Sequence, residues 1–386
     1  MKSFLSQCFE FVLLLSSEKT VMVVGGTGRV GTYASYFLAR NSTVQKLIIV
    51  GRDERKGATV MNNAIINSAF SNGPKEISFL SHDLLKQNDF SKRIQELGPN
   101  IIANATTPVS LYPWFEKQRR EKRSIPLPIT PLYTLPPLLK IMEAIEESGA
   151  RVHVVNVSAP DLLDAVLSKI GLGPTVGAGT IDLTTQGIRW TVGKIKGVPI
   201  EDVSVRMIIH RVHRSGRVPY KEIPHFLKVY VRDQDVTGEF DSTTLISKAM
   251  DISGTESLTC PNLTNDSLTA ASLVRNTLAI LNDTNEIVNA PGVGEMPGGV
   301  PAQLSSKGAK IVLPEGLSYG EALKINEAGL KLEGIERIES DGTVVFTDDY
   351  AKRLKETGLD YSEMKISEVV ERVQQDLPKI KRLIDS

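Results

Sequence analysis

A glycine turn between an apolar run and a helical pattern constrains the fold of this chain most. TVMVV at residues 20–24 is followed by Gly25, by GTGRVG, and then by the helical pattern VGTYASYFLAR. Gly26, Gly28 and Gly31 match G-x-G-x-x-G in the strand–turn–helix context that the motif needs. Such glycines allow a tight turn, a close approach to a diphosphate and close helix packing, with the helix N-terminus facing the phosphates. The alternative is a glycine-rich turn of another α/β fold. The predicted cofactor-binding residues of the turn are Gly25, Gly26, Thr27, Gly28, Arg29, Val30 and Gly31.

The end of the second apolar run indicates which dinucleotide would bind. KLIIV at residues 46–50 ends in Gly51 and Arg52, where a carboxylate would bind the ribose 2′-hydroxyl of NAD. Gly51 would leave space, and the Arg52 guanidinium suits a 2′-phosphate. The pattern therefore favours NADP over NAD. Asp53 remains an alternative ribose acceptor, and Arg52 is otherwise a solvated loop cation.

Alternating apolar runs and helical patterns predict an α/β fold with a doubly wound parallel (Rossmann) sheet. The expected strands cover residues 20–24, 46–50, 77–80, 100–105 and 151–157. The expected helices cover residues 30–40, 54–70, 89–97 and 137–148. We expect residues 1–19 to be an N-terminal extension, residues 20–160 the dinucleotide-binding domain, and residues 161–386 a mixed α+β substrate domain.

The second half mixes helical and strand-like patterns. Helices are expected at residues 161–172, 183–197, 267–283, 319–338 and 368–383, the last kinked at Pro378. Strands are expected at residues 203–213, 226–240 with a turn at 233–235, and 308–317. A hairpin is expected to turn at Asp341-Gly342.

Charge and cysteine content exclude several classes of protein. Lys plus Arg and Asp plus Glu both number 45, so no net charge attracts nucleic acid or a membrane surface. Cys8 and Cys260 are the only cysteines, which excludes a disulfide framework and a zinc cluster and fits a reducing cytoplasm. We expect no metal. Residues 4–15 look like a short signal core, but Glu10 interrupts them and no cleavage site follows, so a packed extension or an upstream start is favoured over export.

A basic, proline-rich segment follows the fourth expected strand. Residues 111–131 hold four prolines, which exclude regular structure, and a loop at this point of a nucleotide-binding sheet lies by the ligand crevice. Arg119, Arg120 and Arg123 could close on an anionic substrate; the alternative is a solvated charged loop. Thr106 is expected to line the cofactor crevice.

These stretches resemble the lactate/malate dehydrogenase family. VVGGTGRVG is similar to the family's first turn, and LIIVGRDE to the strand tip of its NADP-using archaeal malate dehydrogenases. VVNVSAPDLLDAVLSK resembles V-x-N-P-V-D, with Asn156 at the family's asparagine. GAGTIDLTTQGIRW resembles G-S-G-T-x-L-D. The similar segments come in the family's order and cover about residues 20 to 330.

The resemblance implies hydride transfer between a nicotinamide and a hydroxy acid or another alcohol. His213 stands five residues before Val218-Pro219, the family's spacing for its catalytic base, and His210 is the alternative. On a strand the two histidines would face opposite sides. Asp182 would orient the base, or is otherwise a helix-start carboxylate. Asn156 would bind the nicotinamide ribose or the substrate.

The substrate clamp departs from the family. The family's arginine position holds Thr185 or Gln186, depending on the alignment, and Arg189 lies one turn further. This departure argues against simple lactate or malate and leaves a larger or differently charged hydroxy acid, or another alcohol, as the small-molecule substrate. Family members commonly pair, which implies a homodimer or homotetramer.

Three other kinds of protein remain as alternatives. A non-catalytic NADP-binding sensor or scaffold would explain the missing clamp arginine. A NAD-dependent glycosidase would need a metal held by Cys and His, and neither cysteine has a plausible His partner. An opine-type dehydrogenase lacks support in the second half.

Overall fold

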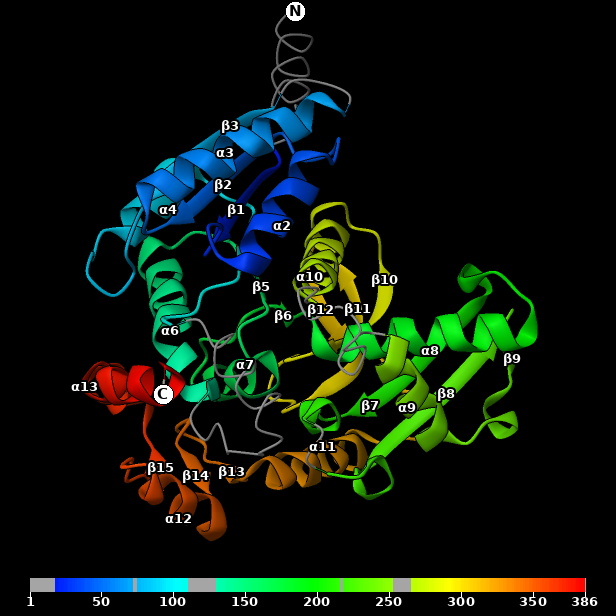
Figure 1. The fold of residues 1–386 in the computed structure, drawn as a ribbon. Coiled ribbons are helices and arrows are strands. Elements are labelled where there is room, and N and C mark those ends of the chain that lie inside the picture. Colours follow the sequence, from blue (N-terminus) through cyan, green and yellow to red (C-terminus); the bar gives the residue numbers. More distant parts are fainter. Residues whose placement is uncertain (1–17, 72–74, 110–129, 216–217, 253–264, 386) are drawn as a thin grey trace, which may run out of the picture.

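The structure is a computed structural model that describes residues 18–71, 75–109, 130–215, 218–252 and 265–385. Figure 1 shows a parallel sheet next to an antiparallel sheet, with a smaller C-terminal sheet below them. Residues 1–17, most of the predicted extension, lie outside the described part of the chain.

The first sheet has six strands in the order β3-β2-β1-β4-β5-β6, all paired in parallel. Its strands are β1 (Thr20–Val24), β2 (Lys46–Gly51), β3 (Glu76–Ser81), β4 (Ile101–Asn104), β5 (His153–Asn156) and β6 (Val176–Gly177). The order reverses between β1 and β4, where ligands of doubly wound sheets bind. The predicted fold class is confirmed. The sixth strand follows residue 160, so the sheet uses more of the chain than the range 20–160.

Helices cover both faces of this sheet, which explains why its central strands are continuous apolar runs. Met22 and Val24 of β1 face one core, and Val21 and Val23 face the other, because strand side chains alternate. The first core is completed by α4 (Phe90–Leu97), α6 (Thr130–Ser148) and α7 (Pro160–Lys169). The second is completed by α2 (Arg29–Ala39), α3 (Glu54–Ala69) and α10 (Asp266–Leu281).

The second half is a mixed α+β unit, as predicted. Its sheet has the order β10-β11-β7-β8-β9, with β12 paired to β11. Its strands are β7 (Val203–Ile209), β8 (His225–Val231), β9 (Gln234–Asp235), β10 (Glu286–Pro291), β11 (Gly299–Ser305) and β12 (Gly308–Ile311). Its helices include α8 (Thr180–Lys196) and α9 (Ser242–Ile252). Short 3₁₀ helices are η1 (Ile200–Asp202), η2 (Arg211–Arg214), η3 (Tyr220–Glu222) and η4 (Thr237–Glu239).

One predicted strand of this half is too long. Residues 203–213 were expected to be extended, but β7 ends at Ile209 and η2 follows. His210 caps η2, since its Nδ1 accepts a hydrogen bond from Val212 N at 3.2 Å. The two histidines therefore do not lie on one strand.

The C-terminal unit contains a three-stranded sheet. It comprises β13 (Ile335–Ile338), β14 (Val344–Phe346), α12 (Asp348–Glu356), β15 (Glu363–Met364) and α13 (Ile366–Asp385). The predicted helix over residues 319–338 is wrong beyond α11 (Tyr319–Glu333), because Gly334 has φ 104° and ends the helix. The hairpin at Asp341-Gly342 is confirmed, with φ 78° at Gly342. The last helix continues through Pro378.

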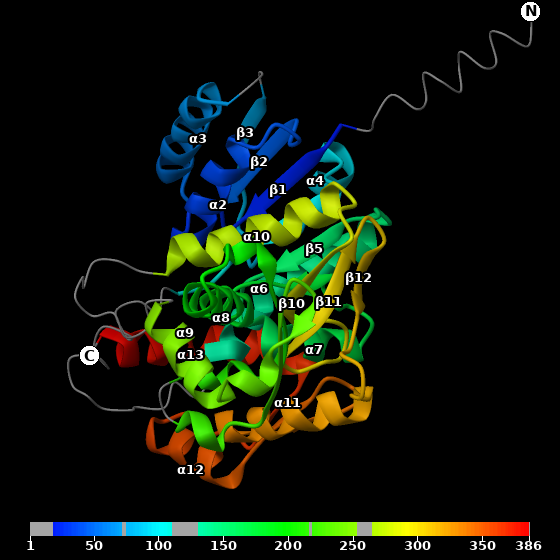
Figure 2. The ribbon, with the colours of Figure 1, turned by 90° about the vertical axis from the view of Figure 1, so that its right-hand side faces the viewer.

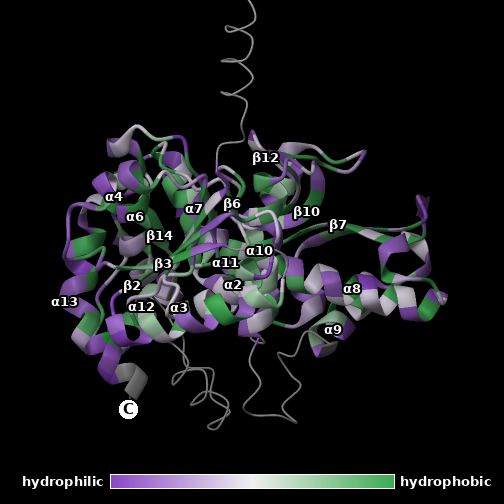
Figure 3. Cartoon of the chain, turned by 90° about the horizontal axis from the view of Figure 1, so that it is seen from above, coloured by the Kyte–Doolittle hydropathy of each residue, from purple (hydrophilic) through white to green (hydrophobic). Residues whose placement is uncertain are grey.

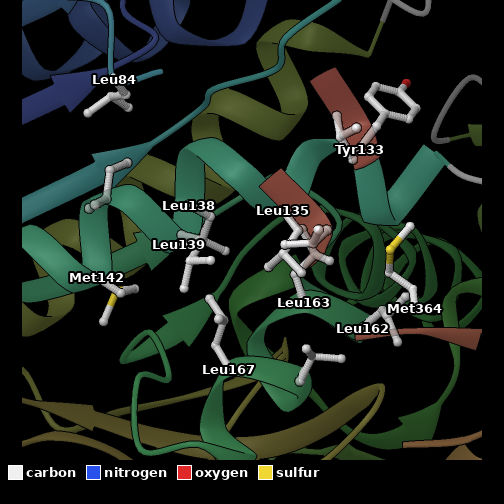
Figure 4. Packing of buried hydrophobic residues seen from close by; sticks show 14 of the residues in the cluster. Leu84, Tyr133, Leu135, Leu138, Leu139, Met142, Leu162, Leu163, Leu167 and Met364 are labelled. Carbon is white, nitrogen blue, oxygen red and sulfur yellow. The ribbon is translucent and has the colours of Figure 1, made fainter. Parts of the chain in front are cut away.

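The C-terminal unit shares the core of the parallel sheet. In Figure 4, Leu138 and Leu139 of α6 point toward Leu167 of α7, and Met364 of β15 lies beside Leu162. Figure 3 shows hydrophobic and hydrophilic residues alternating along α8 and α13, as expected for helices buried on one side. No helix of the described residues is long and apolar enough to cross a membrane.

Candidate functional site

The glycine turn packs three backbone segments against one another. Gly25 has φ 80°, and a Cβ there would lie 2.6 Å from the carbonyl oxygen of Ala105, just after β4. A Cβ at Gly31 would lie 2.2 Å from the Gly25 oxygen. Gly28 N donates a hydrogen bond to the same oxygen at 2.9 Å. Side chains at Gly25 and Gly31 would therefore separate β1, α2 and the end of β4.

The N-terminus of α2 has the character of an anion site. Its capping residue, Gly28, provides no side chain, and the first turn contains no acidic residue. Gly28 and Arg29 are exposed, and Thr27 and Val30 are partly exposed. Free N–H groups and the helix dipole at such an end favour a diphosphate.

A carboxylate from the second half reaches this turn. Arg29 Nε donates to Asp266 Oδ2 at 2.6 Å. Asp266 is the first residue of α10, which lies along α2 in Figure 2. The predicted cofactor residue Arg29 is therefore paired across the two halves of the chain.

At the end of β2, the structure differs from the expectation that Gly51 leaves open space. A Cβ at Gly51 would lie 2.6 Å from Thr27 Oγ1, so the Thr27 side chain occupies the space that this glycine leaves. Arg52 is exposed, with no ion pair among the described residues. Asp53 caps α3 by accepting from Lys56 N at 3.0 Å, which gives it a structural role.

The carboxyl ends of β4 and β5 are joined by side-chain amides. Asn104 Nδ2 donates to Asn156 Oδ1 at 2.9 Å, and Asn104 Oδ1 accepts from Thr106 N and Oγ1 at 3.1 and 2.8 Å. Asn156 Nδ2 donates to Asp164 Oδ1 at 2.5 Å and to Ser158 O at 3.2 Å. Asn156 is fully buried and both ends of its amide are bound within the protein. In this arrangement Asn156 and Thr106 hold the carboxyl ends of β4 and β5 together, and neither presents a free polar side-chain atom.

A buried acidic pair lies next to Asn156. Asp161 and Asp164 are fully buried at the start of α7. Burial raises the pKa of Asp161 to about 6, an effect that Arg211 partly opposes. Burial also raises the pKa of Asp164 well above its ordinary value, although the bond from Asn156 opposes this. Arg211 itself forms a two-pronged ion pair with Glu333, at 3.0 and 2.5 Å.

The structure separates His213 from the predicted carboxylate. His213 is buried, its Nδ1 lies 2.8 Å from His210 O, and its Nε2 lies 2.8 Å from Thr184 Oγ1. Burial lowers the pKa of His213 to about 3, so the ring is neutral. In that state Nδ1–H donates to the carbonyl and Nε2 accepts from the hydroxyl. Burial also lowers the pKa of His210 to about 4.

Asp182 contacts other residues than His213. Its Oδ1 accepts from Gln186 Nε2 at 2.9 Å and from Arg275 Nη1 at 3.1 Å. The predicted pairing of His213 with Asp182 is therefore wrong in this structure, because α8 turns Asp182 toward α10 and Thr184 toward the histidine.

Arg189 is the predicted substrate arginine that lies within the described residues. Arg189 donates hydrogen bonds to Val203 O, Ile200 O and Gln186 Oε1 at 2.8 to 2.9 Å. All three nitrogens of its guanidinium are therefore bound within the protein, at the start of β7 and on α8. This arrangement contradicts its prediction as a substitute clamp. Arg119, Arg120 and Arg123 lie outside the described residues.

Several residues of this region were not predicted from the sequence. Asp161, Asp164, Arg211 and Glu333 come from three distant segments, and charged residues are ordinarily exposed. Gly329 gives an indirect signal, since a Cβ there would lie 2.2 Å from His210 Cβ. Among the residues that the structure describes, no group of three His, Cys, Asp or Glu side chains has metal-binding geometry.

Comparison with known proteins identifies the fold. No protein-family model matches the sequence, and no curated protein matches it. Solved structures do match. A lactate dehydrogenase from a Medee basin deep-sea metagenome library is 20% identical, with a TM-score of 0.58, over 82% of this chain and 97% of that one. The malate dehydrogenase of Picrophilus torridus is 16% identical, with a TM-score of 0.58, over 82% and 96%. The lactate dehydrogenase of Cryptosporidium parvum, solved with lactic acid and nicotinamide adenine dinucleotide, is 14% identical, with a TM-score of 0.57, over 83% and 96%.

The chain therefore has the fold of lactate and malate dehydrogenases, spanning almost the whole length of these proteins. The resemblance inferred from the sequence motifs is confirmed at the level of the fold. Identities of 14 to 20% mark a divergent sequence.

The buried acid pair predicts a pH-dependent difference in stability. Because the folded-state pKa of Asp161, about 6, exceeds its ordinary value of 3.8, its contribution to stability is complete below pH 4 and is lost as pH rises toward 6. The Asp161→Asn variant lacks this loss. Its free energy of unfolding relative to wild type should rise between pH 4 and 6, by at most about 1.4 kcal/mol per pH unit.

Urea unfolding at a series of pH values measures this difference. Comparing variant with wild type removes the opposite slope from the two buried histidines. Asp251→Asn, at an exposed aspartate, is the control and should show no trend. A constant difference between Asp161→Asn and wild type would contradict a raised pKa at Asp161.

Proposed function

We propose that the chain binds a nicotinamide adenine dinucleotide at the β1–α2 turn and acts as an oxidoreductase of the malate/lactate dehydrogenase type. The observation that carries this proposal is the uncapped N-terminus of α2 above Gly25, Gly28 and Gly31. Two proteins with the same fold support it: the Cryptosporidium parvum lactate dehydrogenase binds lactic acid and nicotinamide adenine dinucleotide, and the Plasmodium falciparum malate dehydrogenase binds NADH.

The residues of the turn suit such a ligand. The N–H groups at the start of α2 would hold the diphosphate, and exposed Arg52 would bind a 2′-phosphate, which favours NADP over NAD. The bound nicotinamide supplies the hydride acceptor or donor. The substrate would be a hydroxy acid or another alcohol.

His213 is the proposed proton acceptor. It is neutral, and its bond to His210 O directs the Nε2 lone pair away from the main chain, as a base requires. To take a proton from a substrate hydroxyl, Nε2 must exchange the Thr184 hydroxyl for the substrate. A pKa lowered this far weakens the base, which makes substrate-dependent rearrangement part of the proposal.

The same surroundings favour a second candidate, a dinucleotide-binding sensor or scaffold without catalysis. His213 has no carboxylate partner among the described residues, and Asn156 has its amide fully bound. Thr185 and Gln186 supply no guanidinium where the related fold would clamp a substrate.

Removing the Arg52 guanidinium tests the choice of dinucleotide. Arg52→Ala should raise the Kd for NADP about tenfold, since a charge-assisted phosphate contact contributes about 1.4 kcal/mol. The Kd for NAD should change less than about twofold. Isothermal titration calorimetry measures both, with Arg40→Ala, at the exposed arginine that follows the last residue of α2, as control. Equal losses for both dinucleotides would exclude Arg52 from the 2′-phosphate.

Turnover separates the two candidate functions. Wild-type protein should oxidise NADPH with at least one member of a panel of 2-oxo acids, followed by nicotinamide absorbance. His213→Gln should lower kcat by about 100-fold or more while the Kd for NADP stays unchanged. The control is His225→Gln, whose histidine binds Ile223 O and Ser242 Oγ. Binding without turnover in wild type would favour the sensor, and full activity of His213→Gln would refute the base.

We also propose that the chain is a homodimer. Exposed apolar side chains gather on the neighbouring helices α2 and α3, which are joined by a bond from Asn63 to Tyr36. They are Tyr33, Phe37, Ile65, Ile66 and Phe70, with Phe70 74% exposed. Patches of this kind mark protein–protein contacts.

Light scattering after gel filtration tests the dimer. Wild type should have the mass of two 42.2-kDa chains. The double variant Ile66→Lys/Phe70→Lys should shift toward one chain, because lysines on this face would be buried unpaired. Leu332→Lys, at an exposed leucine of α11, should leave the mass unchanged. A wild-type monomer, or a double variant that stays dimeric, would contradict the proposal.

A further inference from the structure

We propose that Asp266 competes with the dinucleotide diphosphate for Arg29. In the protein without ligand the carboxylate pairs with this guanidinium, and binding exchanges the carboxylate for the diphosphate. The inference rests on the proposed dinucleotide site and adds a residue, from the second half of the chain, that sets its affinity.

The geometry places both groups at the end of α2 that would face the ligand. Arg29 is the first residue of α2, directly after Gly28. Its Nε lies 2.6 Å from Asp266 Oδ2, and the side chains are 43% and 22% exposed. The first turn of α2 has no acidic residue of its own, and Asp266 is the carboxylate paired with its first side chain. A diphosphate bound at the N–H groups of this turn would lie within reach of the same guanidinium.

Electrostatics set the direction of the effect. The pair is partly exposed, so its contribution to stability is small. Its effect on a ligand is larger, because the guanidinium must leave the carboxylate before it binds phosphate and because like charges then lie close together. Both terms weaken binding, and both disappear when the carboxylate becomes an amide.

Other residues of α10 bind the rest of the protein, so the helix can keep its position when Asp266 releases Arg29. Arg275, near the middle of α10, pairs with Asp182 of α8 at 3.1 Å and with Glu286 of β10 at 3.5 Å. Asn276 Nδ2 donates to Gly177 O at 3.0 Å, and Ser272 Oγ accepts from Gly179 N at 2.9 Å. These contacts lie one to three helical turns from Asp266. The exchange is therefore local and requires no movement of the whole helix.

Calorimetric titration of the full chain with NADP at low ionic strength tests the proposal. Asp266→Asn should bind NADP about five- to tenfold more tightly than wild type, and the difference should shrink in high salt. Asp202→Asn is the matched control. Asp202 Oδ2 accepts a hydrogen bond from Arg232 Nε at 2.8 Å in an exposed ion pair between η1 and the residue that follows β8. Its Kd should equal that of wild type.

A double-mutant cycle tests the exchange itself. Arg29→Met should weaken binding more in the Asp266→Asn background than in wild type, because in wild type the arginine must first give up its carboxylate. Equal losses in the two backgrounds would overturn partner exchange.

The outcomes separate this inference from the proposed function. If wild type binds NADP and Asp266→Asn binds no more tightly, the inference fails and the dinucleotide site stands. If neither protein binds NAD or NADP while both are folded by circular dichroism, the site itself is refuted, and the inference with it.

Discussion

The close packing of backbone at Gly25, Gly31 and Ala105 is the constraint on which the rest of this structure depends. Since no side chain fits between these segments, α2 begins directly over the carboxyl ends of β1 and β4. The same approach places the Thr27 side chain against Gly51 and brings Arg29 within reach of α10. One local set of glycines thus positions the start of α2 and lets Arg29 join the two halves of the chain beside it.

The parallel sheet could be predicted because its central strands are buried on both faces and therefore read as continuous apolar runs between helical patterns. Element ends were harder to predict. The strand through His210 ends early because that histidine caps a 3₁₀ turn, which periodicity does not reveal. The end of α11 had a usable signal in Gly334, whose left-handed conformation ends helices commonly. Tertiary packing determined the course of the chain at His210.

The candidate site also has one part that the sequence predicts and one part that it does not. The glycine turn proposed to bind the dinucleotide lies within seven consecutive residues, so spacing alone predicts it. The proposed substrate side is assembled from distant segments, and sequence order does not show which carboxylate faces which histidine. Asp182 and Thr184 are two residues apart on α8, yet Arg275 contacts one and His213 the other. The partly buried Arg211–Glu333 pair joins the histidine turn to the end of α11, where the C-terminal unit begins. This unit therefore supports the region of the predicted base.

The start of α2 is the proposed binding site for the diphosphate of a nicotinamide dinucleotide. A crystal structure of the chain grown with saturating NADP tests it most directly. We predict diphosphate oxygens within about 3 Å of the N–H groups following Gly28, with the 2′-phosphate against the Arg52 guanidinium. A dinucleotide bound elsewhere, or a turn with no nucleotide under those conditions, would contradict it.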